Sequence, residues 1–326
     1  MRTTCLEFRL EAGDLRDETF RLKAVLQTFC RITLMLSRSI SSPIVLTIAG
    51  FDPSGGAGIL ADARVLTAFG CRPVAAITSV TFQNSKTFLG AIHQTSESLR
   101  AQILPLVKEF RIAAVKIGML PTRDLVLEVA RLLRETKMPA PVVDPVLRSS
   151  SGAELMEPAA REAWLGELMP LARLITPNIP EAEILSGLPI NSESNMHEAA
   201  AKLREAGARA VLVKGGHLPV GRTACPPSIG TETPRQVPAL SAEAIDLLDD
   251  DGTVTILRGE WIDGPPARGT GCMLSAAIAA GLARDMNLPE SVKAAKQFVA
   301  GQIRSAAQSG SDHARLELTE MTVLEK

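Results

Sequence analysis

Apolar positions follow two different periods along the chain from residue 44 onward. Short runs rich in β-branched residues, which are typical of buried strands, alternate with longer stretches in which apolar residues return every three or four positions. The runs predict strands over residues 44–49, 74–80, 113–117, 141–146, 174–176 and 210–213. The periodic stretches predict helices over residues 59–69, 96–109, 122–136, 158–169, 180–187 and 195–206. This alternation predicts an α/β fold, with a mostly parallel central sheet flanked by helices on both faces.

The pattern changes beyond residue 216. Residues 217–241 contain five prolines and show no periodicity, which predicts a surface loop or insertion. Two apolar runs, 244–248 and 253–257, are separated by three aspartates and a glycine and predict a β-hairpin. Two helices, over residues 271–284 and 289–308, are expected to complete the fold.

The first 42 residues differ from the rest of the chain. They mix scattered arginines with acidic residues and contain no continuous apolar segment of the kind that a secretory signal needs. We expect an N-terminal extension with no part in catalysis over residues 1–42, one domain over residues 43–310, and a C-terminal tail over residues 311–326.

Composition narrows the function classes. The 326 residues, 46% of them hydrophobic, suffice for one large domain with a sizeable core. The 35 basic and 36 acidic residues give a net charge of -1, which argues against partners such as nucleic acid or an anionic membrane surface. No apolar run approaches the ~18–20 residues that a membrane-spanning helix requires.

The residues available for chemistry are unusual. The five cysteines are widely scattered, which argues against a disulfide framework and a zinc site and favours a cytoplasmic location. The chain has four histidines and no tyrosine. Any catalysis is therefore expected to depend on backbone amides, carboxylates, a lysine or a thiol.

Two glycine-rich turns each precede a predicted helix. The first spans residues 50–58, and the second is Gly269-Thr270-Gly271-Cys272. Neither matches a Walker A loop or a G-x-G-x-x-G dinucleotide fingerprint. Glycines here would let the backbone approach an anionic ligand at a helix amino terminus, although a purely structural turn explains each one equally well.

Polar residues follow three of the predicted strands. Asp144 ends one strand, Asn178 and Glu181 follow the next, and Lys214 follows a third. Because the carboxyl ends of parallel strands meet at one edge of a sheet, these groups would bring together a cation for phosphate and oxygen ligands for Mg²⁺. A turn or a helix cap is the more common role of any one of them taken alone.

Cys272 is the most notable thiol. Its position in the first turn of a predicted helix is expected to favour the thiolate and to lower its pKa. The structural alternative is a small side chain that packs the start of the helix.

The segment from Leu46 to Asp62 resembles the opening of hydroxymethylpyrimidine/phosphomethylpyrimidine kinases, which belong to the ribokinase-like superfamily. Further motifs follow in family order and extend the resemblance over about residues 44–308. They are Gln83-Asn84, Lys116-Ile117-Gly118-Met119-Leu120, Val143-Asp144-Pro145-Val146, Thr176-Pro177-Asn178-Ile179-Pro180-Glu181-Ala182, Lys214-Gly215-Gly216-His217 and Gly269-Thr270-Gly271-Cys272.

The resemblance implies a ribokinase-like fold and an enzyme that uses ATP and Mg²⁺. It implies phosphorylation of the hydroxymethyl group of 4-amino-5-hydroxymethyl-2-methylpyrimidine, then of the monophosphate, to give the pyrophosphate used in thiamine biosynthesis. Its partners would be the small pyrimidine and ATP, in a homodimer.

The resemblance also implies a role for each candidate residue. Gln83 and Asp62 would hold the ring nitrogen and amino group of the pyrimidine, with Gly50 and Met119 lining the pocket. The family roles of the catalytic and metal-site residues are as follows: the amides of Gly269, Thr270, Gly271 and Cys272 form the anion hole, Lys214 neutralises phosphate charge, and Asp144, Asn178 and Glu181 organise Mg²⁺ through waters. Cys272 would be the base that accepts the hydroxyl proton.

Two departures from the family pattern bear on substrate range. Arg268 stands where the family usually has histidine, and Phe51 is expected to place a bulky ring beside the substrate pocket. Three other functions remain open: a pyridoxal kinase of the same superfamily, a non-catalytic ribokinase-like ligand-binding protein, and a hydrolase with Cys272 as nucleophile. Gln83 argues against the first, the joint presence of Lys214 and Cys272 with the strand-end residues argues against the second, and the lack of a suitably placed histidine argues against the third.

Overall fold

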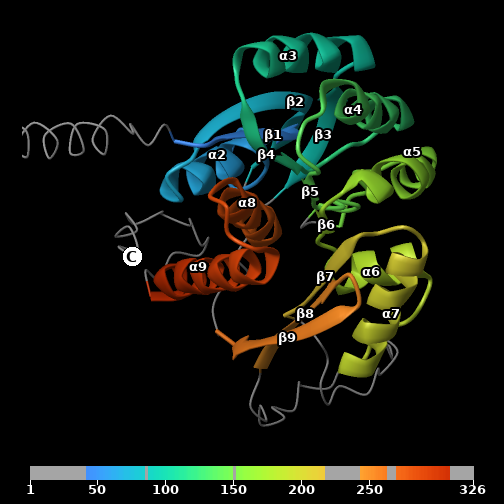
Figure 1. Cartoon of the computed structure of the whole chain (residues 1–326), viewed down its shortest axis with the longest axis vertical. Helices are drawn as coiled ribbons and strands as arrows, with labels where there is room; N and C mark the ends of the chain where they lie inside the picture. The colour runs from blue at the N-terminus through green and yellow to red at the C-terminus, as the bar shows by residue number, and fades with distance from the viewer. Residues whose placement is uncertain (1–41, 85–86, 150–151, 217–242, 263–268, 309–326) are drawn as a thin grey trace, which may run out of the picture. The chain divides into compact units, whose positions relative to one another are not determined.

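The computed structural model describes residues 42–84, 87–149, 152–216, 243–262 and 269–308. The expected loop at 217–241, the C-terminal tail and all of the N-terminal extension except Ser42 lie outside these residues. In the described part of the chain, nine strands form one sheet in the order β3-β2-β1-β4-β5-β6-β7-β8-β9 (Figure 1).

The sheet is parallel through its centre. Neighbouring strands run parallel from β2 across β1, β4, β5 and β6 to β7. The edge strand β3 pairs antiparallel with β2, and β8 and β9 form an antiparallel hairpin beside β7, as the sequence predicts. The strands are β1 (Ile44–Phe51), β2 (Arg72–Gln83), β3 (Phe88–His93), β4 (Ile112–Ile117), β5 (Val142–Val143), β6 (Leu174–Ile175), β7 (Ala210–Gly215), β8 (Glu243–Asp250) and β9 (Thr253–Glu260).

Helices pack on both faces of this sheet and give the expected three layers (Figure 1). Helices α2, α8 and α9 share one hydrophobic core with one face of the sheet, and α3 to α7 share a second core with the other face. The helices are α2 (Gly58–Ala68), α3 (Ser96–Glu109), α4 (Arg123–Thr136), α5 (Pro158–Ala163), α6 (Ile179–Ser186), α7 (Glu193–Glu205), α8 (Thr270–Ala283) and α9 (Leu288–Gln308). None of the helices in the described ranges is long and apolar enough to cross a membrane.

Strand β1 shows why the central strands read as continuous apolar runs. Leu46 and Ile48 belong to the core on one face of the sheet, and Val45 belongs to the core on the other. All three side chains are fully buried. Because alternate side chains of a strand point to opposite faces, a strand covered on both sides buries successive side chains, which in the middle of β1 are apolar except for Thr47.

Two elements differ from the sequence prediction. The edge strand β3 was not predicted, because its apolar residues do not show the pattern of a buried strand: Leu89 is 79% exposed and Ile92 is 60% exposed. The helix predicted over residues 158–169 is divided into α5, a π-helical turn η1 (Trp164–Leu168) and a 3₁₀ turn η2 (Met169–Leu171). Pro170 lacks the N–H that a continuing α-helix would need at that position.

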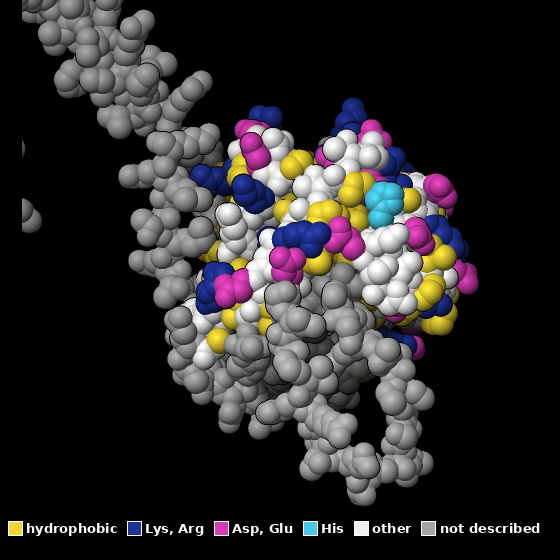
Figure 2. Space-filling model, turned by 90° about the horizontal axis from the view of Figure 1, so that it is seen from below, with side chains coloured by type: hydrophobic (Ala, Val, Ile, Leu, Met, Phe, Trp, Pro, Cys, Tyr) yellow, Lys and Arg dark blue, Asp and Glu magenta, His cyan; other side chains and the backbone are white. Residues whose placement is uncertain are grey.

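The surface reflects the near-neutral net charge. On the face drawn in Figure 2, the Lys and Arg side chains lie interspersed with the Asp and Glu side chains.

Candidate active site

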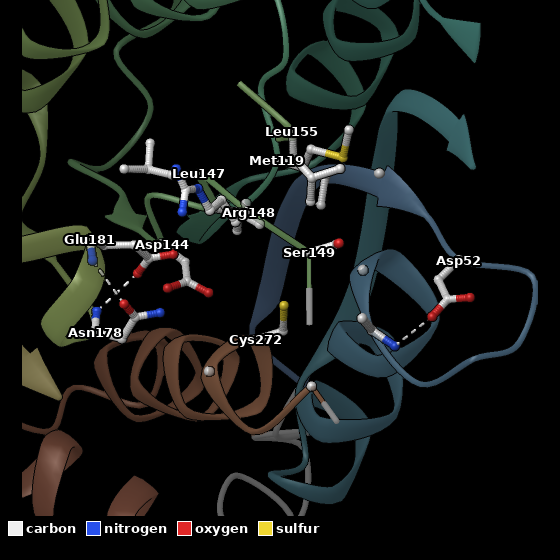
Figure 3. Close-up of a pocket in the computed structure, with 18 of the residues that line it drawn as sticks. Asp52, Met119, Asp144, Leu147, Arg148, Ser149, Leu155, Asn178, Glu181 and Cys272 are labelled. Atoms are coloured by element: carbon white, nitrogen blue, oxygen red, sulfur yellow. Dashed lines mark hydrogen bonds between the residues drawn. The ribbon is translucent and has the colours of Figure 1, made fainter. Parts of the chain in front are cut away.

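A cavity of about 490 Å³ lies at the edge of the sheet where the parallel strands end (Figure 3). Its wall is formed by residues at or just beyond the carboxyl ends of β1, β4, β5, β6 and β7 and by the amino terminus of α8. The structure brings together here all the predicted site residues except Asp62: Gly50, Gln83, Met119, Asp144, Asn178, Glu181, Lys214, Gly269, Thr270, Gly271 and Cys272. The expectation that strand-end residues meet at one edge is confirmed.

The two glycine-rich turns touch each other in the cavity wall. Gly269 has φ +77°, and a Cβ atom there would lie 2.0 Å from the carbonyl oxygen of Gly56. Gly58 has φ +59°, and its Cβ would lie 2.1 Å from the carbonyl oxygen of Gly50. Both positions therefore need glycine for two reasons, the left-handed backbone and the close approach of another chain segment.

The carboxylate of Asp52 holds the first turn in shape. It accepts hydrogen bonds from the backbone N–H of Ser54 at 2.9 Å and of Ala57 at 3.1 Å. Figure 3 shows this residue at the far side of the cavity from Asp144. Asp52 lines the cavity although the sequence analysis assigned it no role.

The amino terminus of α8 presents backbone N–H groups to the cavity. Gly269 is its N-cap, and no side chain there bonds to the first turn. The first intrahelical bond runs from the N–H of Met273 to the carbonyl of Gly269. The N–H groups of Thr270, Gly271 and Cys272 precede it and have no carbonyl partner within the helix, so this terminus is suited to an anion.

Lys214 places a positive charge against this helix terminus. Its Nζ lies 3.0 Å from the position that a Cβ of residue 271 would take. Nζ donates a 2.8 Å hydrogen bond to Oδ1 of Asp144, which also accepts one from the hydroxyl of Thr176 at 3.1 Å. Burial acts to lower the pKa of Lys214, but the carboxylates of Asp144 and Glu181 outweigh it, so the pKa is raised and the ammonium is retained.

Asn178 and Glu181 form a capping box at the start of α6. The side chain of Asn178 accepts the N–H of Glu181 at 2.9 Å, and Glu181 Oε2 accepts the N–H of Asn178 at 2.9 Å, as the dashed lines in Figure 3 show. The capping role, which the sequence analysis kept as an alternative, is thus present in residues that also line the cavity. Burial raises the pKa of Glu181 to about 7, with Lys214 acting in the opposite direction.

Asp144 and Glu181 would be sufficient for Mg²⁺ only if the phosphates of a bound substrate supplied further oxygen ligands. Within the described residues, no group of three or more His, Cys, Asp or Glu side chains could hold a metal ion. Mg²⁺ usually keeps several waters and binds through one or two carboxylates plus the phosphates of a substrate. Asp144 and Glu181, both lining the cavity, match that smaller requirement.

Asp62 lies one layer below the cavity wall. It is fully buried, and its carboxylate accepts hydrogen bonds from the ammonium of Lys116 at 2.8 and 3.0 Å and from the hydroxyl of Thr47 at 2.6 Å. Lys116, also fully buried as a residue, does line the cavity. Asp62 was predicted to hold the substrate directly, but the structure does not place it in the cavity wall. It is linked to the cavity only through Lys116.

Lys116 was missed as a site residue. Burial acts to lower its pKa, but the charge of Asp62, with smaller contributions from Cys272 and Asp144, raises it above its ordinary value. Lys116 is consequently an ammonium at neutral pH. The available signal was a charged residue near the end of the otherwise apolar strand β4.

The expectation that the helix terminus lowers the pKa of Cys272 is wrong. Burial in the cavity wall raises the pKa to about 11, although the ammonium of Lys116 and the backbone N–H of Gly58 act to lower it. The carboxylates of Asp144 and Asp62 also act to raise it. Cys272 is therefore a thiol at neutral pH in the ligand-free protein.

The two departures from the family pattern have different outcomes. Phe51 does not line the cavity, so the expectation of a bulky ring beside the substrate pocket is wrong. Its carbonyl, at the end of β1, accepts the hydroxyl of Thr81 at 2.9 Å. Arg268 lies outside the described residues.

A largely parallel sheet with a lysine, two carboxylates and an uncapped helix terminus around a cavity at its strand ends is the arrangement expected of a small-molecule kinase of the ribokinase-like fold. The family model described as phosphomethylpyrimidine kinase matches residues 52–317. The chain belongs to this family.

Named relatives agree with this assignment. The hydroxymethylpyrimidine/phosphomethylpyrimidine kinase of Streptomyces coelicolor is 38% identical over 83% of this chain and 92% of its own. A crystal structure of phosphomethylpyrimidine kinase from Clostridium difficile matches with TM-score 0.65 and 32% identity, over 80% of this chain and 99% of that one. An ADP complex of Bacillus subtilis pyridoxal kinase matches with TM-score 0.69 and 32% identity, over 81% and 92% of the two chains.

The buried pair beneath the cavity makes a stability prediction. We expect Lys116→Met to lower the free energy of unfolding by about 3–5 kcal/mol, because Asp62 is left buried without its counter-ion. The double variant Asp62→Asn/Lys116→Met removes both charges and should lose less. Urea unfolding followed by circular dichroism measures both, and equal losses in the two variants would contradict the role of the pair.

The raised pKa of Cys272 makes a second prediction. Alkylation of Cys272 by iodoacetamide should accelerate about tenfold per pH unit from pH 7 to 9, since the thiolate fraction changes tenfold per unit well below the pKa. Mass spectrometry of the peptide that contains Cys272 gives the rate. Glutathione, as a control thiol with an ordinary pKa near ~8.5, should level off toward pH 9. A plateau for Cys272 by pH 8 would show that its pKa is not raised.

Proposed function

We propose that this protein transfers the γ-phosphoryl group of ATP to 4-amino-5-hydroxymethyl-2-methylpyrimidine and then to the resulting monophosphate. The observation that carries the proposal is one cavity in which Lys214, the free amides of α8 and the thiol of Cys272 lie with Gln83 and Met119. The product is the pyrophosphate that thiamine biosynthesis uses. Membership of the phosphomethylpyrimidine kinase family supports this choice of substrate.

Phosphoryl transfer is mainly a matter of positioning and of stabilising charge. In the first step the substrate hydroxyl oxygen forms a bond to the γ-phosphorus, while the bond from that phosphorus to the β,γ-bridging oxygen breaks and its electrons leave with ADP. The amides of Thr270, Gly271 and Cys272 would bind the oxygens of the transferring group, and Lys214 would neutralise their charge. The hydroxyl proton would pass to the thiolate of Cys272.

The thiolate that can accept this proton is the minor form at neutral pH, because the pKa of Cys272 is about 11, so turnover of the alcohol should rise with pH. The acceptor hydroxyl becomes strongly acidic only as its oxygen bonds to phosphorus, so the proton can leave late in the step. Bound phosphates would lie against the α8 terminus near Lys116 and Lys214.

We also propose that Mg²⁺ accompanies the nucleotide. Asp144 and Glu181 would hold it, mainly through its water ligands, with the phosphate oxygens completing the coordination. The ion supplies neutralisation of phosphate charge when it is bound. Asn178 has a positioning part, because its side chain fixes the backbone of Glu181.

The pyrimidine would bind at the other end of the cavity. Gln83 offers a donor and an acceptor on one side chain, which matches a ring nitrogen beside an amino group. Gly50 and Met119 face each other closely, since a Cβ on residue 50 would lie 3.2 Å from Sδ of Met119. The absence of a side chain on residue 50 lets Met119 pack against the backbone of β1 in the cavity wall.

Pyridoxal kinase is the second candidate activity, favoured by the match to the Bacillus subtilis pyridoxal kinase. The two substrates can be separated by offering the pyrimidine alcohol, its monophosphate and pyridoxal in parallel with Mg-ATP and resolving the products by anion exchange. We expect both pyrimidines to be turned over with a higher kcat/KM than pyridoxal. Turnover of pyridoxal without turnover of either pyrimidine would overturn the proposal.

We propose further that the protein is a homodimer of the cytoplasm. The support for a dimer is the sheet edge at β2 and β3, where Phe82, Leu89 and Ile92 are 45%, 79% and 60% exposed. Native proteins seldom leave an apolar strand edge open to water. The cytoplasmic location rests on the scattered cysteines and stays a prediction.

Substituting the thiol tests the base. We expect Cys272→Ala to lower kcat for the pyrimidine alcohol by about 10²–10⁴-fold, the usual range for a general base, while nucleotide affinity survives because the backbone amide of residue 272 is retained. Turnover of the monophosphate should fall less, since a phosphate dianion has no proton to lose. Steady-state kinetics and calorimetric titration with ADP make the measurement. Full activity on the alcohol would exclude the base role.

A further inference from the structure

Three cationic side chains line the cavity among the described residues: Lys116, Arg148 and Lys214. Two of them are committed to buried carboxylates. Lys116 pairs with Asp62 and Lys214 with Asp144, each at 2.8 Å. These pairs contribute little net charge to the cavity.

Arg148 differs from both lysines. Its guanidinium lies 3.7 Å from Glu154, and the two side chains are 58% and 74% exposed. An exposed pair at that distance is worth little, because solvent screens it. The guanidinium of Arg148 can therefore leave Glu154 and bind an anion in the cavity with little loss of free energy.

The backbone at Arg148 is well fixed. The residue follows β5 through Leu147, and it forms an antiparallel bridge with Glu154. On either side, Leu155 N–H donates to Leu147 O at 2.9 Å, and Ser149 N–H donates to Ala153 O at 2.8 Å. This short ribbon holds the start of the arginine side chain at the cavity, and only the side chain itself needs to move.

The direction of the side chain places it between the two ends of the site. In Figure 3, Arg148 extends from the side of Met119 and Leu155 toward the side of Asp144 and Glu181. The first pair lies where the pyrimidine is proposed to bind, and the second lies where the nucleotide phosphates are proposed to bind. A group joined to the pyrimidine and directed at the nucleotide would pass close to this arginine.

The two proposed reactions differ in the charge of that group. The acceptor in the first step is a neutral hydroxymethyl group, whereas the acceptor in the second is a phosphate monoester with a charge of about −1.5 to −2 at pH 7. An oxygen of that phosphate forms a bond to the γ-phosphorus of ATP, the bond to the β,γ-bridging oxygen breaks, and ADP leaves with the electron pair. The second step thus brings an additional anion against the nucleotide phosphates, which requires a further cation.

We infer that Arg148 binds the phosphate of the monophosphate acceptor and so determines the preference of the enzyme for its second substrate, an inference that rests on the proposed function. A guanidinium is suited to this task, because its planar N–H fork binds two phosphate oxygens at once. The neutral alcohol of the first step makes no use of it.

The experiment compares both acceptors in one set of variants. We expect Arg148→Gln to raise the KM for the monophosphate at least tenfold more than the KM for the alcohol, at saturating Mg-ATP. Arg148→Lys should recover part of the loss, because it retains the charge without the fork. Arg111→Gln is the matched control, since Arg111 is an exposed arginine just before β4, at the opposite edge of the sheet, and should leave both KM values unchanged.

The outcomes separate the inference from the proposed function. If the wild-type enzyme phosphorylates both pyrimidines and Arg148→Gln changes the two KM values equally, the inference is wrong and the proposed function stands. If the wild-type enzyme phosphorylates neither pyrimidine, both are wrong. Thermal unfolding of each variant shows whether the fold is retained, and an unchanged melting temperature with a selective rise in KM distinguishes phosphate binding from a structural role.

Discussion

The parallel pairing of the strands from β2 to β7 is the constraint on which the site depends. Parallel neighbours leave the sheet at the same edge, and the backbone groups beyond the last inter-strand bond must find other partners. Local devices satisfy some of them here: Asp52 binds the amides of Ser54 and Ala57 in the first glycine turn, and Asn178 caps α6. The groups that end the elements are therefore the groups that form the cavity wall. Residues such as Asn178 therefore have two roles, because the place where they cap a helix is also the place where the cavity forms.

Charge in the cavity is arranged in pairs. Lys116 and Lys214 can be buried because Asp62 and Asp144 accompany them, and an isolated ammonium in their place would be strongly destabilising. The amides of the α8 terminus, which carry no net charge, lie beside these pairs in the cavity wall. Burial at the same site raises the pKa of Cys272, so its side chain is a thiol at neutral pH. Folding disfavours unpaired charges in a buried cavity wall, whereas phosphoryl transfer needs charged groups there. Pairing each buried lysine with a carboxylate allows the charged groups to be present without an isolated buried charge.

Much of this arrangement could be predicted from particular residues. Asp144 and Lys214 follow predicted strands, and parallel topology alone brings them to one edge. The depth of Asp62 could not be predicted, because the spacing of residues on α2 does not tell how far the helix sinks beneath the cavity. Strand β3 escaped prediction because its apolar residues are exposed, so no burial pattern marks it. The pKa of Cys272 depends on neighbours from three other segments, α2, β4 and the residues after β5, which no local pattern reveals.

The alternation of strands and helices, the parallel centre of the sheet and most of the residues at its carboxyl edge follow from the sequence by itself, because periodicity and chain direction are local properties. Tertiary structure decided which charges meet. Lys116 and Asp62 are 54 residues apart, and Lys214 and Asp144 are 70 apart. Such pairs form only when separate strands and helices assemble, since burial and distance arise from packing and not from sequence neighbours. The same packing decided that Asp62 lies beneath the cavity while Lys116 reaches it.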